Sequence, residues 1–274
     1  MSIKTIVITR PSGQARQFIE VLTKAIEQAG IAKRSFAQIL SLPLLTIIPK
    51  DDEQLADHIA TVLNHADLAI FVSPNAIESV MRLLERNWQD FSKNIIPIGV
   101  MGCSSAMALK NHGIGLEGSP TPIYMPSSNE QWDSGGLWTV LQRLDWDWTT
   151  KKVIFFKGDG GRDWLADTIK KAGAAVEAIL IYTRMPLDVA NPAWLAVREM
   201  DISRSLWVLT SSEAVRYLGQ VTKDELPQGL QHASALCPHH NIADAARAIG
   251  FGEVFTSEPG DEALIKAALA WLTI

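Results

Sequence analysis

The stretch FFKGDGGRDWLADTIKKAGAAVEAILIYTR, residues 155–184, carries the pattern that decides the fold. The apolar run from Val153 to Phe156 leads into Gly158, Gly160 and Gly161, and apolar residues then recur at helical spacing. A second apolar run closes the stretch. Glycines between a strand and a helix suit an anion held by backbone N–H groups at the helix N-terminus. The order strand, loop, helix, strand predicts a βαβ unit of parallel sheet.

The spacing of these glycines does not fit a nucleotide. The loop GDGGR, residues 158–162, matches neither G-x-G-x-x-G nor G-x-x-x-x-G-K-[ST]. No acidic residue ends a second strand about 20 positions further on, as a dinucleotide site requires. The loop therefore predicts an anion of another kind.

The composition indicates a globular protein with room for two domains. The chain has 274 residues, of which 47% are hydrophobic and 20% charged. No apolar run approaches the ~20 residues that cross a bilayer, and the start MSIKTIVITRP lacks the features of a secretion signal. We expect a cytoplasmic protein that does not enter a membrane. The net charge of −5, with dispersed Lys and Arg, argues against a nucleic-acid partner.

The thiols and imidazoles do not predict a metal site or a disulfide. Cys103 and Cys237 stand alone, without a second cysteine or a histidine at ligand spacing. We expect both to be small buried apolar residues. His239 and His240 are adjacent, but no further ligand motif accompanies them. No metal and no cofactor is expected.

Strand-like runs alternate with helical segments along the chain. An α/β class with parallel sheets covered by helices follows from this alternation. The expected pairs are TIVIT with a helix over 13–29, LAIFV with 75–86, IPIGV with 104–111, VIFF with 162–172 and SLWVL with 213–219. Polar Ser, Pro, Gly and Asn loops follow the strands, at the edge where open parallel sheets bind ligands.

An internal repeat predicts two similar lobes. FVSPNAIESVMRLL matches VLTSSEAVRYLGQV in kind, GVMGCSSAMALKNHGI matches LCPHHNIADAARAIGF, and TIVITRPSGQARQFIEVL matches KVIFFKGDGGRDWLADTI. The copies are not in tandem order, so the lobes must interleave along the chain. The segments SFAQILSLPLLTII and AVEAILIYTR have the composition of crossings between them. Two crossings predict a hinge, and a hinge predicts a cleft.

Six fragments, in order, resemble the uroporphyrinogen-III synthase family, cofactor-free cyclases of tetrapyrrole biosynthesis. The resemblance covers nearly the whole chain. It is carried by VITRPSGQA, FVSPNAI, the pattern G-C-S-S-A-x-x-L-x-x-x-G-I at 102–114, KGDGGRDWLADTIKKAGAAVEAILIYTR, LTSSEAV and GDEALIKAAL.

The resemblance implies two lobes, each a parallel sheet flanked by helices, joined by a two-stranded connector. We expect lobe one at 1–38 and 184–274, lobe two at 42–180, and the connector at 39–41 and 181–183. It also implies a monomeric carbon-oxygen lyase (hydro-lyase) that converts hydroxymethylbilane, a linear tetrapyrrole with eight carboxylates, into uroporphyrinogen III and water. The step belongs to haem, sirohaem and cobalamin biosynthesis, with a transient hand-over from hydroxymethylbilane synthase as a further expectation.

In the implied chemistry, the geometry in which the substrate is held decides which isomer forms. Loss of the terminal hydroxyl leaves an electrophilic azafulvene, which the far pyrrole attacks at its substituted carbon to form a spiro intermediate. Cleavage and reclosure then leave that ring inverted. Because the bilane also closes without an enzyme, to the uninverted isomer, folding the substrate correctly is the main task, and proximity effects reach about 7–11 kcal/mol.

Two hydroxyl side chains are candidates by resemblance. Tyr182, in IYTR, resembles a family tyrosine whose phenol assists hydroxide departure, and it is the candidate catalytic residue. The alternative is a connector tyrosine packed against a lobe. Ser105 falls where the family often has threonine and is a candidate for carboxylate binding, or else an ordinary hydroxyl at a helix start.

The remaining substrate-binding candidates follow the strands. Ser73 and Asn75 occupy the same place in the repeat as Ser211 and Ser212, and helix capping is the alternative for these four. Further candidates are Lys157, Gly158, Gly161, Arg162 and Arg10.

Two of these cations have a structural alternative. Arg162 has the alternative of an ion pair with Asp159, and Arg10 that of an ion pair within a lobe. The tryptophans at 132, 138, 146 and 148 are expected in packing rather than in stacking on pyrroles. The rival function is a two-lobed cytoplasmic binding protein for an anionic small molecule, without catalysis.

Overall fold

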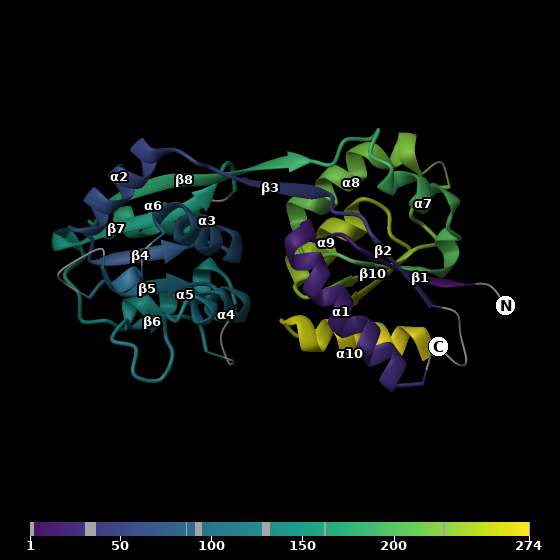
Figure 1. The fold of residues 1–274 in the computed structure, drawn as a ribbon, viewed down its shortest axis with the longest axis horizontal. Helices are drawn as coiled ribbons and strands as arrows, with labels where there is room; N and C mark the ends of the chain where they lie inside the picture. The colour runs from purple at the N-terminus through teal and green to yellow at the C-terminus, as the bar shows by residue number, and fades with distance from the viewer. Residues whose placement is uncertain are drawn as a thin grey trace. The chain divides into compact units, whose positions relative to one another are not determined.

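The protein divides into two compact units (Figure 1). The structure is a computed structural model that describes residues 3–30, 37–85, 87–90, 95–127, 132–161, 163–226 and 228–273. Unit 1 comprises Met1–Thr46 and Met185–Ile274, and unit 2 comprises Ile47–Arg184. Each unit is built on its own sheet.

Unit 1 contains a five-stranded sheet in the order β11-β10-β9-β1-β2, with every pairing parallel. Its strands are β1 (Lys4–Ile8), β2 (Ala37–Ser41), β9 (Ser205–Val208), β10 (Ser234–Cys237) and β11 (Glu253–Thr256). Its helices are α1 (Ser12–Gln28), α7 (Ala193–Glu199), the 3-10 helix η4 (Ile202–Arg204), α8 (Ser212–Glu225), α9 (His240–Ala248) and α10 (Asp261–Thr273).

Helices cover both faces of this sheet (Figure 1). Alternate strand residues point to opposite faces, so Ile6 and Ile8 pack with α1 and α10, whereas Val7 packs with α7, α8 and α9. Trp207 of β9 is fully buried on the second face and meets Phe251 edge to face. The sheet is therefore buried on both sides, as parallel sheets generally are.

Unit 2 contains a six-stranded sheet in the order β3-β8-β7-β4-β5-β6. Its strands are β3 (Leu45–Pro49), β4 (Leu68–Phe71), β5 (Ile98–Val100), β6 (Ile123–Tyr124), β7 (Lys152–Gly158) and β8 (Ala175–Pro186). Its helices are α2 (Glu53–Leu63), α3 (Pro74–Leu84), η2 (Trp88–Asp90), α4 (Cys103–Asn111), α5 (Ser134–Gln142), η3 (Trp148–Thr150) and α6 (Trp164–Lys171).

The faces of this sheet are also covered by separate helices. Helices α2, α3 and α4 pack on one face against Phe71 and Phe156, whose rings stack with centroids 4.9 Å apart. Helices α5 and α6 pack on the other face against Ile70 and Phe155. Both units are thus doubly wound, which confirms the expected α/β class of two similar, helix-flanked, largely parallel sheets.

The two sheets repeat one topology. The sequence repeat equates β1 with β7, β9 with β4, and β10 with β5. With β2 and β11 then matched to β8 and β6, the order β2-β1-β9-β10-β11 in unit 1 becomes β8-β7-β4-β5-β6 in unit 2. Strand β3 is the extra member, at the edge of the second sheet. The interleaved repeat therefore corresponds to a repeated order of strands.

The chain passes between the units along β3 and β8. The Lys50 N–H donates to the Ile181 carbonyl and the Leu187 N–H to the Leu44 carbonyl, so these neighbouring segments run antiparallel. The passage differs from the expected connector at 39–41, because those residues form β2 and pair with β1. Residues 42–46 join unit 1 rather than lobe two, because Leu42 and Leu44 are buried in its core. Residues 181–184 belong to unit 2.

Two helix ends differ from expectation for identifiable reasons. The helix expected to reach Arg86 ends at Leu84, because Glu85 adopts the left-handed conformation with φ 47°. The helix expected to stop at Gly219 continues to Glu225. Gly219 permits close packing instead of ending the helix, since a Cβ there would lie 2.5 Å from the Ile249 side chain. Across the described ranges, no helix combines the length and apolar character needed to span a membrane.

The two thiols should differ sharply in reactivity. The expectation of burial is wrong for Cys103, which is exposed at the start of α4, and confirmed for Cys237, which is buried in β10. Burial raises the pKa of the Cys237 thiol to about 12. A thiol reagent at pH 8 should modify Cys103 in the folded protein and Cys237 only after denaturation. Mass spectrometry of the native and unfolded protein measures this, and modification of Cys237 in the native protein would contradict its placement.

Candidate functional site

The candidate site of unit 2 lies where its central strands end. A cavity of about 220 Å³ opens there, lined partly by Val72 after β4, Met101 after β5, Lys157 of β7 and Arg184 of β8. Gly160 and Gly161 of the glycine-rich loop also line it. The carboxyl edge of an open parallel sheet is where such folds bind ligands. The structure thus brings Lys157 and Gly161 to one cavity, together with Arg184.

A bulge in β8 sets the direction of Tyr182. Lys157 is in register with Leu180, but the next residue, Gly158, is in register with Tyr182, so β8 holds one extra residue at Ile181. The Tyr182 ring consequently packs in the same core cluster as Ile181. A bulge re-aims the side chains that follow it. Regular alternation would have placed this ring on the opposite face.

Tyr182 is buried, with 1% of its surface exposed, and its hydroxyl has two polar contacts. The Ser73 and Tyr182 hydroxyl oxygens are 3.0 Å apart, and the Arg184 Nη2 donates to the Tyr182 oxygen at 3.3 Å. The Arg184 guanidinium also lies over the tyrosine ring, 5.4 Å from its centroid. A Cβ on Gly158 would lie 2.4 Å from that ring, which explains the glycine. Three candidates, Ser73, Gly158 and Tyr182, are therefore in one cluster.

The glycine-rich loop is attached to β8 through Asp159. The Asp159 N–H donates to the Tyr182 carbonyl at 3.2 Å, and the Asp159 carboxylate accepts the Arg184 backbone N–H at 3.1 Å. The Asp159 carbonyl accepts from the Arg184 Nη1 at 2.9 Å. Gly160 and Gly161 then take positive φ angles of 66° and 92°, which favour glycine.

Of the two cations of the loop, Lys157 is described by the structure and has an ion-pair partner. The Lys157 ammonium pairs with the Asp163 carboxylate, which precedes α6. Arg162 lies outside the described residues, so its proposed roles stay predictions. Asp159 is the partner proposed for Arg162 in an ion pair. Its carboxylate accepts the Arg184 backbone N–H.

The serines after β4 and β9 are helix caps. Ser73 accepts the Ala76 N–H and Ser211 accepts the Ala214 N–H, each at 3.3 Å. The capping alternative is therefore observed in both repeats, and Ser73 additionally contacts Tyr182. Ser212 donates to the Asn241 carbonyl at 3.3 Å. Asn75 is half-buried in the first turn of α3.

Two helices of unit 2 begin without a side-chain cap. Among the described residues, no side chain caps α4, whose N-cap residue is Gly102, or α6, whose N-cap residue is Asp163. Ser105 is buried in the first turn of α4. Beside it, burial raises the pKa of the Cys103 thiol, with the Lys110 charge acting in the opposite direction. Uncapped N-termini leave N–H groups that suit an anion.

The candidates of unit 1 are engaged in local contacts. Arg10, after β1, donates to the Asp261 carboxylate at 2.7 Å and lies over the Phe18 ring. The lobe-packing ion pair is thus the observed arrangement. The His239 Nδ1 accepts the Asn241 N–H and caps α9, while its ring lies 4.1 Å from that of His240. In the described part of the chain, no group of three or more His, Cys, Asp or Glu side chains is placed to hold a metal.

The tryptophans of unit 2 are in packing contacts. Trp138 and Trp146 each lie 5.4 Å from Trp148, ring centroid to ring centroid. All three pack against the core on the face of α5 and α6. The Trp132 ring lies beside Gly102, the N-cap residue of α4, where a Cβ would be 3.2 Å from the ring. These contacts agree with the expected packing role.

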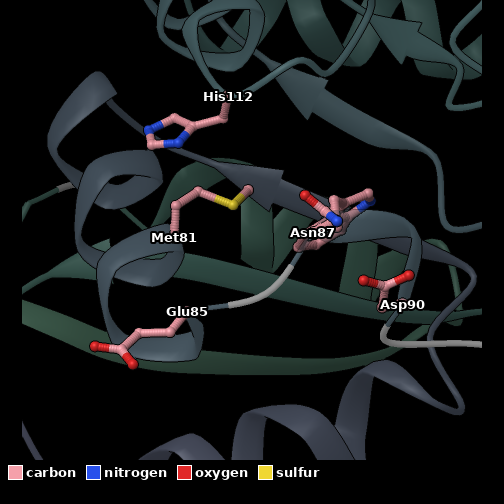
Figure 2. Close-up of a pocket in the computed structure, with 6 residues that line it drawn as sticks. Met81, Glu85, Asn87, Asp90 and His112 are labelled. Atoms are coloured by element: carbon pink, nitrogen blue, oxygen red, sulfur yellow. The ribbon is translucent and has the colours of Figure 1, made fainter.

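A larger cavity, of about 400 Å³, lies between the ends of α3 and α4 and includes Trp88 of η2 (Figure 2). Figure 2 shows that the Glu85 carboxylate points away from His112 and Asp90. His112 instead pairs with Glu78 at 3.0 Å. The polar groups of this cavity diverge, and convergent polar groups are what a binding site needs. The cavity at the strand ends is therefore the better candidate.

Sequence reasoning did not identify Arg184 and Asp159 as members of the candidate site. Both lie in the motifs that carry the resemblance, IYTR and GDGG, and a signal for Arg184 was its position two residues after Tyr182. The pattern did not show that the arginine turns back onto the phenol, because that depends on the bulge and on the pairing of β7 with β8.

The fold and the site define a two-unit, doubly wound α/β protein with a glycine-rich loop suited to anions. The family model described as "Uroporphyrinogen-III synthase HemD" matches residues 21–266. This chain therefore belongs to the uroporphyrinogen-III synthase family, and the resemblance is confirmed.

Curated relatives carry the same family name, and solved structures show the same fold. The uroporphyrinogen-III synthase of Escherichia coli (strain K12) is 25% identical over 274 residues, covering 96% of this chain and 99% of that protein. That of Proteus mirabilis is 26% identical over 190 residues, covering 68% and 83%. Among structures, a mutant uroporphyrinogen III synthase from Thermus thermophilus has a TM-score of 0.58 at 14% identity, covering 98% and 99%. The Helicobacter pylori protein has 0.56 at 14%, covering 97% and 99%. These two structures share the fold.

Gly158→Ala should disturb the Tyr182 cluster. The added methyl would overlap the ring and should lower the free energy of unfolding by about 1–3 kcal/mol. The control is Gly13→Ala in α1, where a Cβ meets nothing within 4 Å and stability should be kept or rise by up to about 1 kcal/mol. Urea unfolding of both variants measures this, and an equal stability for the two would contradict the packing described.

Proposed function

We propose that this protein is a uroporphyrinogen-III synthase that cyclises hydroxymethylbilane, with inversion of the last pyrrole ring and release of water. The observation that carries the proposal is the glycine-rich loop at the end of β7, held by Asp159 and Arg184 beside Tyr182, in a chain of this family. The activity would be that of a hydro-lyase without a cofactor. We also propose that the protein is a monomer and that it receives the bilane from hydroxymethylbilane synthase.

An acidic protein can bind this polyanion only through local groups. The net charge is −5, so the overall field repels a substrate with eight carboxylates. The uncapped starts of α4 and α6 supply partial positive charge, worth about 0.3–1 kcal/mol each when exposed. Gly160 and Gly161 let the backbone approach a carboxylate closely.

The cations are the second source of affinity in the proposal. Lys157 lines the cavity but is paired with Asp163, so a substrate carboxylate would compete with that side chain. Arg10, Ser211 and Ser212 stay proposed carboxylate contacts, with the local partners described above as their alternatives. Asn75 and Ser105, each in the first turn of a helix, also stay proposed carboxylate contacts.

The reaction needs a choice between two closures more than a strong acid. Breaking the C–O bond of the hydroxymethyl group releases hydroxide, which leaves as water once protonated. The far pyrrole then forms a C–C bond through its substituted carbon or through its free one. A protein that holds the substituted carbon nearest the azafulvene selects the inverted ring, and only contacts stronger in that transition state help.

The burial of Tyr182 favours a supporting role over that of a strong general acid. Its hydroxyl already contacts Ser73 and Arg184 and has little exposed surface. The proposed role is to hold the loop and the α3 cap in place, with the phenol assisting hydroxide departure as a secondary contribution.

Tyr182→Phe should therefore reduce turnover only in part. Loss of one hydrogen-bonding hydroxyl, worth about 1 kcal/mol, predicts a fall in kcat of about five- to tenfold. A general acid would contribute about 10²- to 10⁴-fold, so a folded but inactive variant would contradict the supporting role. The matched control is Tyr124→Phe in β6, which should leave kcat unchanged.

The function is tested with a bilane made in situ by hydroxymethylbilane synthase. Chromatography of the oxidised products separates isomers I and III. Isomer III in excess over the spontaneous isomer I supports the synthase. Isomer I alone, with saturable binding of uroporphyrinogen, would instead favour the rival anion-binding protein without catalysis.

A further inference from the structure

Arg184 contacts both parts of the proposed site, the glycine-rich loop and the phenol. One guanidinium nitrogen, Nη1, donates to the Asp159 carbonyl at 2.9 Å. The other, Nη2, donates to the Tyr182 hydroxyl oxygen at 3.3 Å. The residue is half-buried and lines the cavity at the strand ends. We infer that Arg184 is a positioning residue of the synthase reaction, which fixes the direction of the Gly160 N–H and of the Tyr182 hydroxyl; this inference rests on the proposed function.

The first effect follows from the planarity of the peptide group. The Asp159 carbonyl and the Gly160 N–H belong to one peptide unit, and in a trans peptide they point in opposite directions. Holding the carbonyl on Arg184 therefore turns the Gly160 N–H away from β8. Gly160 is exposed and has φ 66°, a conformation in which a glycine leaves the loop free to rotate unless it is held. Arg184 thereby keeps one amide donor aimed at a substrate carboxylate.

The second effect follows from the donor inventory of arginine. A guanidinium donates hydrogen bonds and accepts none, so the Tyr182 proton cannot lie toward Arg184. The Ser73 oxygen already accepts the Ala76 N–H, which leaves it free to share one proton with the phenol. Arg184 thus confines the phenol proton to the side of the hydroxyl oxygen that faces Ser73.

Lysine cannot replace this arginine. A planar guanidinium presents two nitrogens in a fixed fork, whereas an ammonium is one compact point on a flexible stem. Arg184→Lys keeps the charge but cannot hold the Asp159 carbonyl and the Tyr182 oxygen together in the same geometry. The variant therefore separates geometry from charge.

The test is a double-mutant comparison in the coupled bilane assay. Arg184→Lys should raise KM about tenfold through the loop amide, and lower kcat about threefold through the phenol. In a Tyr182→Phe background the effect on kcat should vanish, while the effect on KM should remain. The control is Arg82→Lys in α3, an exposed arginine of the same unit. Unchanged KM for Arg184→Lys, or a kcat effect that persists without the phenol, would overturn the inference.

A second measurement separates this inference from the proposed function. Amide hydrogen exchange of the peptide that contains Asp159, Gly160 and Gly161 needs no turnover. Exchange should be at least tenfold faster in Arg184→Lys, or in Arg184→Gln if the lysine variant does not fold, than in the wild type. Equal exchange rates would refute the role of Arg184 even in an active enzyme. If the wild-type protein makes only isomer I but the variant still exchanges faster, the proposed function and the role of Arg184 in it are refuted, and what remains is that Arg184 holds the loop.

Discussion

The contact between Gly158 and the Tyr182 ring is the constraint on which the candidate site depends. A ring can lie against a strand this closely only where the facing residue lacks a Cβ, because an added Cβ would be 2.4 Å from the ring. The bulge in β8 brings the ring to that point. Once there, the phenol meets Ser73 at the start of α3 and Arg184 at the end of β8. The contact between Gly158 and Tyr182 thus positions β7, β8, the start of α3 and the glycine-rich loop relative to one another.

The repeated topology explains why similar sequence motifs have different surroundings in the two units. Ser73 and Ser211 each cap a helix by accepting the N–H three residues further on, since the need to satisfy the first N–H groups is the same in both. Of the two serines, Ser73 is the one whose hydroxyl contacts a tyrosine. The strand equivalent to β8 is β2, which ends at Ser41 and is much shorter. The repeat therefore gives both units the same arrangement of strands and capped helices. In unit 2 the longer β8 adds Tyr182 and Arg184 to the candidate site.

Local groups also allow an acidic chain to bind an anionic ligand. The field of the whole protein decays over about 8–10 Å in salt, whereas helix N-termini and loop amides act at contact distance. In unit 2, Lys157 is paired with Asp163 and the Asp159 carboxylate is bound by a backbone N–H. Such internal pairing holds Asp159 against β8, while the backbone donors remain the groups best suited to a carboxylate.

The sequence by itself determined the α/β class and the interleaved repeat, because period-2 and period-3.6 patterns depend on local burial. The family followed separately, from the resemblance of six motifs in order. The sequence also placed Lys157, Gly158 and Tyr182 in one motif. Only the tertiary structure decided that 39–41 belong to β2, the edge strand of the first sheet, that Gly219 is a packing glycine, and that Arg184 binds the Asp159 carbonyl. Each of these depends on which residue faces another across distant chain segments, and neither composition nor spacing contains that information.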